Sequence, residues 1–288
     1  MTFAEHIAAL PRLGVGISCE FSGTERGPGI DAVELQRAWP ELVHFLEVGA
    51  DTERGLDEHM LRWGDSGLPA TYHFLDLNLA EEQDLDPDWL ERTLAQARRV
   101  NALYLCGDAG YWHLGARERG HELLLPPILS PEAADEMARA TATLQARAGM
   151  LVLPENPPAV AYIGPMHLLD FYGRVCERAD CGMLLDAAHL AVYQRMQGHS
   201  ALTGLDGFPL ERIVELHVAG GTHREHQGLG WIDDTHGPEV LPETWEITQT
   251  LIERCPNLRA VIFEAEHNTP AEIRPGFERL NALFPKEP

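Results

Sequence analysis

Three residues that could bind a metal ion lie close together between Val214 and His236. The apolar run Val214-Glu-Leu-His-Val218 carries His217, a glycine-rich bend follows, and Asp234 and His236 come soon after. Residues two apart in an extended segment point to the same side, so Asp234 and His236 could bind one ion or two neighbouring ions. A hydrogen-bonded pair in a loop is the alternative. Imidazole and carboxylate groups just past a buried strand are typical of a metal site in a barrel mouth.

Two other segments combine the same residue types. Glu155 lies in Leu153-Pro-Glu-Asn-Pro157, where the prolines stiffen the backbone and Asn156 could orient the carboxylate. A structural salt bridge is the alternative for Glu155. Asp186 and His189 are three residues apart and can face one site if the preceding strand turns directly into a helix. Alone, such a pair is as often a helix cap with an incidental histidine, but in this context we interpret both as metal ligands.

The remaining candidates lie singly at or after the ends of apolar runs. The predicted ligands among them are His73, Asp108 and Glu264. A buried structural histidine is the alternative for His73. We interpret Glu47 as a residue that supports the ligands or the fold. The histidines that could gate the site or contact a substrate from loops are His113, His223 and His226.

Eight apolar runs predict the strands that must position these residues. They cover residues 13–19, 42–48, 70–75, 102–106, 150–155, 182–186, 213–218 and 260–264. Short, nearly continuous apolar runs are typical of parallel strands that are covered on both faces. Helices are expected to begin near Pro87, Ser130, Leu241 and Pro270, where acidic residues follow a proline.

Strands that alternate with helices predict an α/β protein, a (β/α)8 TIM barrel that forms a single domain over residues 1–288. A doubly wound open sheet is the alternative, which the lack of a glycine-rich phosphate loop after the first run disfavours. Because the carboxyl ends of barrel strands meet on one face, the candidate ligands should converge there. The segment 107–129 is expected to be an active-site loop rather than a helix.

The composition excludes several classes of partner. With 45 acidic and 22 basic residues, the formal charge is −23, so a nucleic acid partner is not expected. No apolar stretch is long enough to span a membrane, and the N-terminal residues lack the pattern of a secretory signal. The five cysteines form no CxxC pair, and we expect reduced thiols in a cytoplasmic protein.

The sequence also disfavours other catalytic chemistries. It contains no Gly-x-Ser-x-Gly elbow, kinase loop set or Walker loop. A site of imidazoles and carboxylates without thiolate suits iron, manganese or zinc. Because one ion takes about four to six ligands, nine candidates imply two or more metal ions.

The motifs together resemble those of the multinuclear non-heme iron-dependent oxidative enzymes, the family that includes the methanobactin-biosynthesis oxidase. The resemblance extends from Gly14 to Glu264. Its most specific parts are Leu153-Pro-Glu-Asn-Pro157, Cys181-Gly-Met-Leu-Leu-Asp186, Glu215-Leu-His-Val-Ala-Gly220 and Ile232-Asp-Asp-Thr-His236.

This resemblance implies a xylose-isomerase-like TIM barrel that holds two or three Fe ions, with Mn or Zn as alternatives in the purified protein. The iron-ligand roles that it implies fall on His73, Glu155, Asp186, His217, Asp234, His236 and Glu264. It also implies dioxygen-dependent oxidation of a cysteine-containing precursor peptide in natural-product biosynthesis, often with a partner protein that recognises the leader.

The chain departs from the family pattern after the fourth predicted strand. Members commonly carry an iron-binding histidine there, whereas this sequence reads Gly107-Asp-Ala-Gly110. Asp108 could take that role, or His113 could reach the site from the loop. His189 stands where many members have asparagine, which could restore a ligand.

The leading hypothesis is therefore an iron-dependent oxidoreductase that acts on a peptide. A redox-neutral barrel enzyme that uses divalent ions, either a sugar isomerase or epimerase or a phosphate-ester hydrolase, is the first alternative. A non-catalytic metal-binding protein is the second, although closed structural sites seldom use so many carboxylates.

Overall fold

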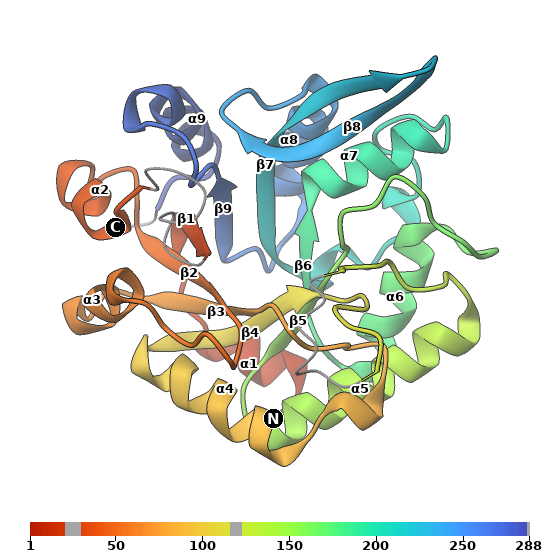
Figure 1. Cartoon of the computed structure of the whole chain (residues 1–288), viewed down its shortest axis with the longest axis horizontal. Coiled ribbons are helices and arrows are strands. Elements are labelled where there is room, and N and C mark those ends of the chain that lie inside the picture. The colour runs from red at the N-terminus through yellow and green to blue at the C-terminus, as the bar shows by residue number, and fades with distance from the viewer. Residues whose placement is uncertain (21–29, 116–122, 287–288) are drawn as a thin grey trace.

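Parallel strands close into a barrel with helices around its outside (Figure 1). The computed structural model describes residues 1–20, 30–115 and 123–286. The strand order is β6-β5-β4-β3-β2-β1-β9-β7, and pairing between β6 and β7 completes the ring. The strands of the ring are β1 (Gly14–Glu20), β2 (Phe45–Ala50), β3 (Ala70–Phe74), β4 (Ala102–Asp108), β5 (Val152–Glu155), β6 (Met183–Asp186), β7 (Ile213–His226) and β9 (Ala260–Glu264).

Helices lie between successive strands, and the four expected helix starts are confirmed by α4, α5, α8 and α9. Ser130 caps α5, with its side chain accepting a hydrogen bond from the Ala133 amide, and Asp86 caps α4 in the same way. Proline occupies the first turn of α4, α5, α8 and α9, where a missing N–H costs nothing. The helices are α1 (Phe3–Ala9), α2 (Ala32–Ala38), α3 (Glu58–Ser66), α4 (Pro87–Arg99), α5 (Pro131–Ala148), α6 (Leu168–Ala179), α7 (Ala187–Met196), α8 (Pro242–Arg254) and α9 (Pro270–Leu283).

A further strand, β8 (Leu229–Gly237), lies outside the ring and was not expected from the sequence. It pairs antiparallel with the second half of β7, so that these two segments form a long hairpin at the edge of the barrel mouth (Figure 1). The apolar pattern of β7 ends near Ala219, and the rest of the strand consists of glycine and exposed polar residues. Without an apolar run or alternation, only the inner half of this strand could be predicted.

One end of the barrel is closed by apolar side chains. Phe3 and Ile7 of α1 form a buried cluster with Phe45, Tyr104 and other residues of the strands. The polar residues at the opposite, carboxyl ends of the strands therefore have an apolar floor beneath them.

The described part of segment 107–129 contains no helix, as predicted, and Tyr111 and Leu125 form an isolated bridge within it. Residues 116–122 lie outside the described part. Among the described residues, no helix has the length and apolar character needed to cross a membrane.

Candidate metal centre

The carboxyl ends of the barrel strands bring the predicted ligands together. β3 places His73, β4 Asp108, β5 Glu155, β6 Asp186, β7 His217 and β9 Glu264 at one mouth, while α7 adds His189 and β8 adds Asp234 and His236. All these residues are buried except Asp234 and His236, whose side chains are 16% and 20% exposed. We refer to these nine residues as the centre.

Glu155 lies in the middle of the centre. Its Oε2 is 2.8 Å from His73 Nε2, and its Oε1 is 3.2 Å from His217 Nδ1 and 3.7 Å from His189 Nδ1. Burial alone would raise the pKa of Glu155, but His217 and His73 lower it below the ordinary value. Glu155 is therefore an ionised carboxylate that faces three imidazoles.

The junction of β6 and α7 holds Asp186 and His189 in fixed orientations. Asp186 caps α7, because its Oδ1 accepts a hydrogen bond of 2.6 Å from the His189 amide. The ring of His189 makes a 2.8 Å contact between Nδ1 and the Asn156 carbonyl, which directs Nε2 toward Asp234 Oδ2 at 3.1 Å. Asp186 is thus the helix cap that the sequence offered as the alternative, while its Oδ2 lies 3.7 Å from His189 Nε2, and its role as a metal ligand stays a prediction.

Asn156 ties β5 to β6 beneath these groups. Its amide nitrogen donates to the Asp186 carbonyl and its side-chain oxygen accepts from the Asp186 amide, both at 3.0 Å. The side chain is buried. Asn156 therefore orients the backbone that carries Asp186. In the sequence it directly follows Glu155.

The β7–β8 hairpin carries Asp234 and His236 on one of its faces. Asp234 Oδ2 is 3.4 Å from His236 Nε2, whereas Asp233 points the other way and pairs with exposed Arg224. His236 has a positive φ of 48° and its Nδ1 lies 2.7 Å from Glu266 Oε1. Burial opposes protonation of His236, but Glu266 and Glu264 raise its pKa well above the ordinary value.

His217 is the most enclosed imidazole. Nδ1 lies 3.1 Å from Glu264 Oε1, and Nε2 lies 3.0 Å from Glu47 Oε1. Neither ring nitrogen has a hydrogen-bond partner of suitable geometry. The ring is therefore surrounded by carboxylates that approach it closely without forming directed hydrogen bonds.

Other atoms of the centre share this lack of partners. Buried side-chain atoms without a hydrogen bond include His73 Nδ1, Asp108 Oδ1, Asp186 Oδ2, Asp234 Oδ1 and Glu264 Oε2. An unpaired buried polar atom costs about 1–3 kcal/mol, and more when the group is charged. A bound cation would satisfy these atoms and offset the mutual repulsion of the carboxylates.

The spacing of the ligand atoms fits metal ions. Among the described residues, four sets have ligand atoms within 4.8 Å of one another. Three of these sets include residues of the centre, namely His73 with Asp108 and Glu155, Glu155 with Asp186 and His189, and Glu47 with His217 and Glu264. Glu155 belongs to two of the sets, as expected of a carboxylate shared by neighbouring ions. The nitrogen and oxygen donors suit iron, manganese or zinc.

The pKa values of the carboxyl groups diverge across the centre. Burial, together with the charge of Glu155, raises the pKa of Asp108 well above its ordinary value. Burial also raises the pKa of Asp186, while the neighbouring imidazoles His236 and His189 lower that of Asp234 against the effect of burial. Without a cation, burial therefore favours the neutral forms of Asp108 and Asp186.

The structure separates the two residues proposed to replace the missing histidine after β4. Asp108 lies in the centre, with Oδ2 4.0 Å from His73 Nε2. His113 does not reach the centre, because its ring is buried against Asp84 Oδ2 at 3.1 Å and the Gly115 carbonyl at 2.8 Å. The alternative that His113 supplies the missing ligand is therefore wrong.

The other histidines of uncertain role lie on the outer part of the hairpin. His223 and His226 belong to the exposed half of β7 rather than to a loop. His223 lines a cavity of about 640 Å³ together with Arg195, Arg224 and Trp231. No residue of the centre is among those described as lining this cavity.

Two acidic residues near the centre escaped the sequence analysis. Glu266 follows β9 by two residues and contacts His236, whereas Glu20 ends β1, the one ring strand for which no ionisable residue was predicted. Burial and the charge of Glu266 raise the pKa of Glu20 to about 7. The strand-end pattern used for the other strands would have found Glu20, and the two-residue spacing from Glu264 would have found Glu266.

The barrel resembles solved structures of xylose-isomerase-like proteins. A xylose isomerase domain containing protein from Salmonella typhimurium aligns with a TM-score of 0.59 at 14% identity, covering 95% of this chain and 98% of that chain. A xylose isomerase-like TIM barrel protein from Mycobacterium smegmatis, solved in complex with magnesium, aligns with a TM-score of 0.55 at 12% identity, covering 96% and 97%. At these identities the likeness concerns the fold alone, and it confirms the predicted xylose-isomerase-like TIM barrel.

Sequence relatives point to one family. A UPF0276 protein from Rhizorhabdus wittichii is 30% identical over 217 residues, which are 74% of this chain and 76% of the relative. A UPF0276 protein from Caulobacter vibrioides is 29% identical over 268 residues, which are 90% and 89% of the two chains. The model of the RiPP precursor modification enzyme family MbnB/TglH/ChrH, whose members modify ribosomally made precursor peptides, matches residues 30–276. The resemblance carried by the motifs is thereby confirmed: the chain belongs to the MbnB/TglH/ChrH family of RiPP precursor modification enzymes.

Proposed function

We propose that this protein is an iron-dependent oxidoreductase that uses dioxygen to oxidise a cysteine-containing precursor peptide in natural-product biosynthesis. Family membership supports the peptide substrate. The observation that carries the proposal of a multinuclear centre is the position of Glu155, which is shared by two sets of closely spaced ligand atoms. Closed structural sites seldom use such a donor set, whereas catalytic iron sites combine imidazoles and carboxylates.

The nine residues of the centre are the proposed ligands of two or three iron ions. They are His73, Asp108, Glu155, Asp186, His189, His217, Asp234, His236 and Glu264. When bound, iron supplies the redox chemistry for oxidation by dioxygen and the positive charge that attracts a substrate thiolate.

The protein's own residues keep the ligands in place and ready to bind. Asn156 holds the backbone of Asp186, and Glu266 holds the ring of His236 through a 2.7 Å contact. Partners of this kind fix the orientation of ligands and commonly change metal affinity about 10- to 100-fold when removed. The apolar floor below the strands keeps water away from the inner side of the centre.

The peptide is proposed to approach along the β7–β8 hairpin. The cavity beside the hairpin has room for several side chains, and His223, Arg224 and Trp231 offer polar and aromatic contacts there. We also propose that a partner protein recognises the leader of the precursor and presents the peptide to this cavity. Peptide contacts at His223 would leave metal binding unchanged, which separates the two roles.

Oxygen uptake tests the proposed reaction. The protein is reconstituted with ferrous iron without oxygen, then mixed with a cysteine-containing precursor peptide encoded beside the gene, and dioxygen consumption and peptide mass are followed. We expect uptake that requires the peptide and a mass change confined to it. Uptake should be lost in Asp234→Ala and retained in Asp233→Ala, because Asp233 points away from the centre. A peptide altered without oxygen uptake would contradict the proposal and favour a redox-neutral reaction.

A further inference from the structure

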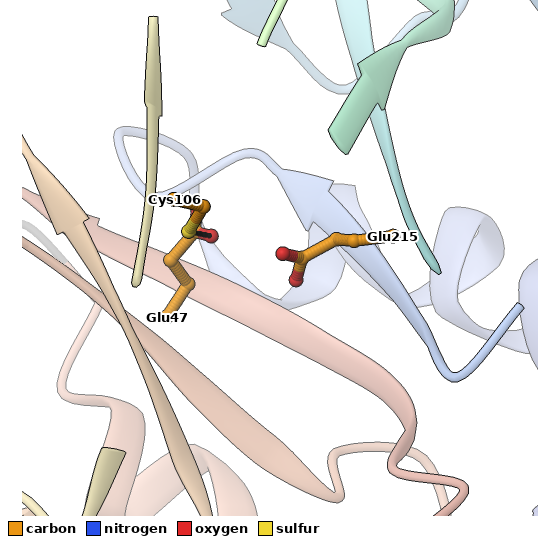
Figure 2. Close-up of side chains that lie close together, drawn as sticks. All are labelled: Glu47, Cys106 and Glu215. Carbon is orange, nitrogen blue, oxygen red and sulfur yellow. Dashed lines mark hydrogen bonds between the residues drawn. The ribbon is translucent and has the colours of Figure 1, made fainter. Parts of the chain in front are cut away.

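A second group of ionisable side chains lies in the barrel interior, next to His217. Glu47 of β2, Cys106 of β4 and Glu215 of β7 point toward one another there (Figure 2). We call these three residues the inner cluster. Their ligand atoms lie within 4.8 Å of one another, and their side chains are fully or almost fully buried.

Glu215 is the unexplained member of the inner cluster. Its residue exposure is 0%, and among the described residues neither carboxylate oxygen has a hydrogen bond of suitable geometry, even with the neighbouring Tyr104 hydroxyl. The Tyr104 hydroxyl, also buried, likewise lacks a hydrogen bond of suitable geometry. A buried carboxylate of this kind costs several kcal/mol, by order of magnitude, unless a proton or a cation neutralises it.

The other two members already face each other. The Cys106 thiol donates to Glu47 Oε2 over 3.1 Å, while Glu47 Oε1 contacts His217. No lysine or arginine is among the buried side chains of the described residues. Glu47 pairs with the His217 imidazole, but an ion pair with lysine or arginine does not account for Glu215.

We propose that the inner cluster binds one thiophilic divalent cation, separate from the ions of the centre and beyond the function proposed above. The Cys106 thiolate and the carboxylates of Glu47 and Glu215 would be its ligands. A thiolate among oxygen donors favours ions such as Zn²⁺, Fe²⁺ or Co²⁺ over Mg²⁺ or Ca²⁺. Binding displaces the Cys106 thiol proton, and any proton on Glu215, to solvent.

The cation would also act on the centre through Glu47. One oxygen of Glu47 faces Cys106 and the other faces His217 Nε2 at 3.0 Å. Fixing the Glu47 carboxylate by a cation would thus fix the orientation of His217. Glu47 is in this sense a positioning residue that links the two groups.

Cobalt provides a spectroscopic test, because a Co²⁺–thiolate bond produces a charge-transfer absorption that nitrogen and oxygen ligands do not. Metal-free wild-type protein is titrated with Co²⁺ under reducing conditions. We expect the amplitude of this absorption to correspond to one Co²⁺–thiolate site per chain, while Co²⁺ that binds to the centre adds nothing to it. Its absence from the wild-type protein would overturn the proposal, whatever the variants do.

Three variants assign the absorption to the inner cluster. Cys106→Ser should abolish it, and Cys19→Ser, which removes a buried cysteine at the end of β1, should retain it. The near-isosteric Glu215→Gln should weaken Co²⁺ binding about tenfold or more. An absorption that persists in Cys106→Ser, or binding unchanged in Glu215→Gln, would contradict the proposal.

A further variant separates this proposal from the proposed function. Asp234→Ala should lose ions from the centre and keep the thiolate absorption, because Asp234 contacts His189 and His236 and not the inner cluster. Loss of the absorption in a folded Asp234→Ala protein, as judged by circular dichroism, would show that the two groups do not bind metal independently.

Discussion

Replacing Asn156 by alanine should weaken both the fold and metal binding. The substitution removes two hydrogen bonds of 3.0 Å to the Asp186 backbone and leaves one buried N–H and one buried C=O without these partners. At about 1–3 kcal/mol for each unsatisfied group, the free energy of unfolding should fall by about 2–6 kcal/mol. This is a large fraction of the roughly 5–15 kcal/mol typical of native proteins. Iron affinity should fall about 10- to 100-fold as well, because Asp186 loses its support.

Urea unfolding of the metal-free protein and anaerobic iron titration measure these two effects. Asn257→Ala is a matched control, because Asn257 also donates to a carbonyl, that of Glu211, but at the surface. It should change the free energy of unfolding by less than about 0.5 kcal/mol and leave iron binding intact. If Asn156→Ala behaved like this control, the positioning role of Asn156 would be refuted.

Three further predictions concern the centre. Asp108→Asn should lower the number of bound irons. His113→Ala should lower the melting temperature without changing that number, because His113 pairs with Asp84 away from the centre. Equal metal content in both variants would refute the assignment of Asp108 as a ligand. Burial opposes protonation of His73, but its acidic neighbours raise its pKa to about 10. The charged His73 therefore contributes stability to the metal-free protein in full below about pH 6.5, and this contribution is lost as the pH rises toward 10. His73→Gln should flatten this fall in the urea midpoint between pH 6.5 and 10, and an unchanged slope would contradict the prediction. Ferrous iron at about 100 times its dissociation constant should stabilise the protein by about 2.7 kcal/mol for each ion bound, and a melting temperature that iron leaves unchanged would argue against a preformed centre.

Much of this arrangement could be predicted because the barrel repeats one rule. Each parallel strand is an apolar run, so an ionisable residue at its carboxyl end stands out, as Glu155 and Glu264 do. The fold and the gathering of six candidate ligands at one mouth followed from this rule, whereas His189 comes from α7 and Asp234 and His236 come from β8. The same rule applied to β1 would have included Glu20.

Residues outside the ring were less accessible to prediction. In the described part of the chain β8 pairs with β7 alone and lies at the barrel edge, and it has no continuous apolar run. The spacing of Asp234 and His236 still predicted that both lie on one face of the strand. The choice between Asp108 and His113 depended on the path of a loop, which local sequence does not determine. Glu215 lies within an apolar run and was passed over, because nothing in the sequence distinguishes a carboxylate that points into a barrel from one that points out.

The most direct test of the central claim is the iron content of protein purified and reconstituted without oxygen. The shared position of Glu155 between two sets of ligand atoms predicts at least two irons per chain. Asp234→Ala should reduce that number, and Asp233→Ala should not. A single tightly bound ion, unchanged by Asp234→Ala, would contradict a multinuclear centre at the barrel mouth.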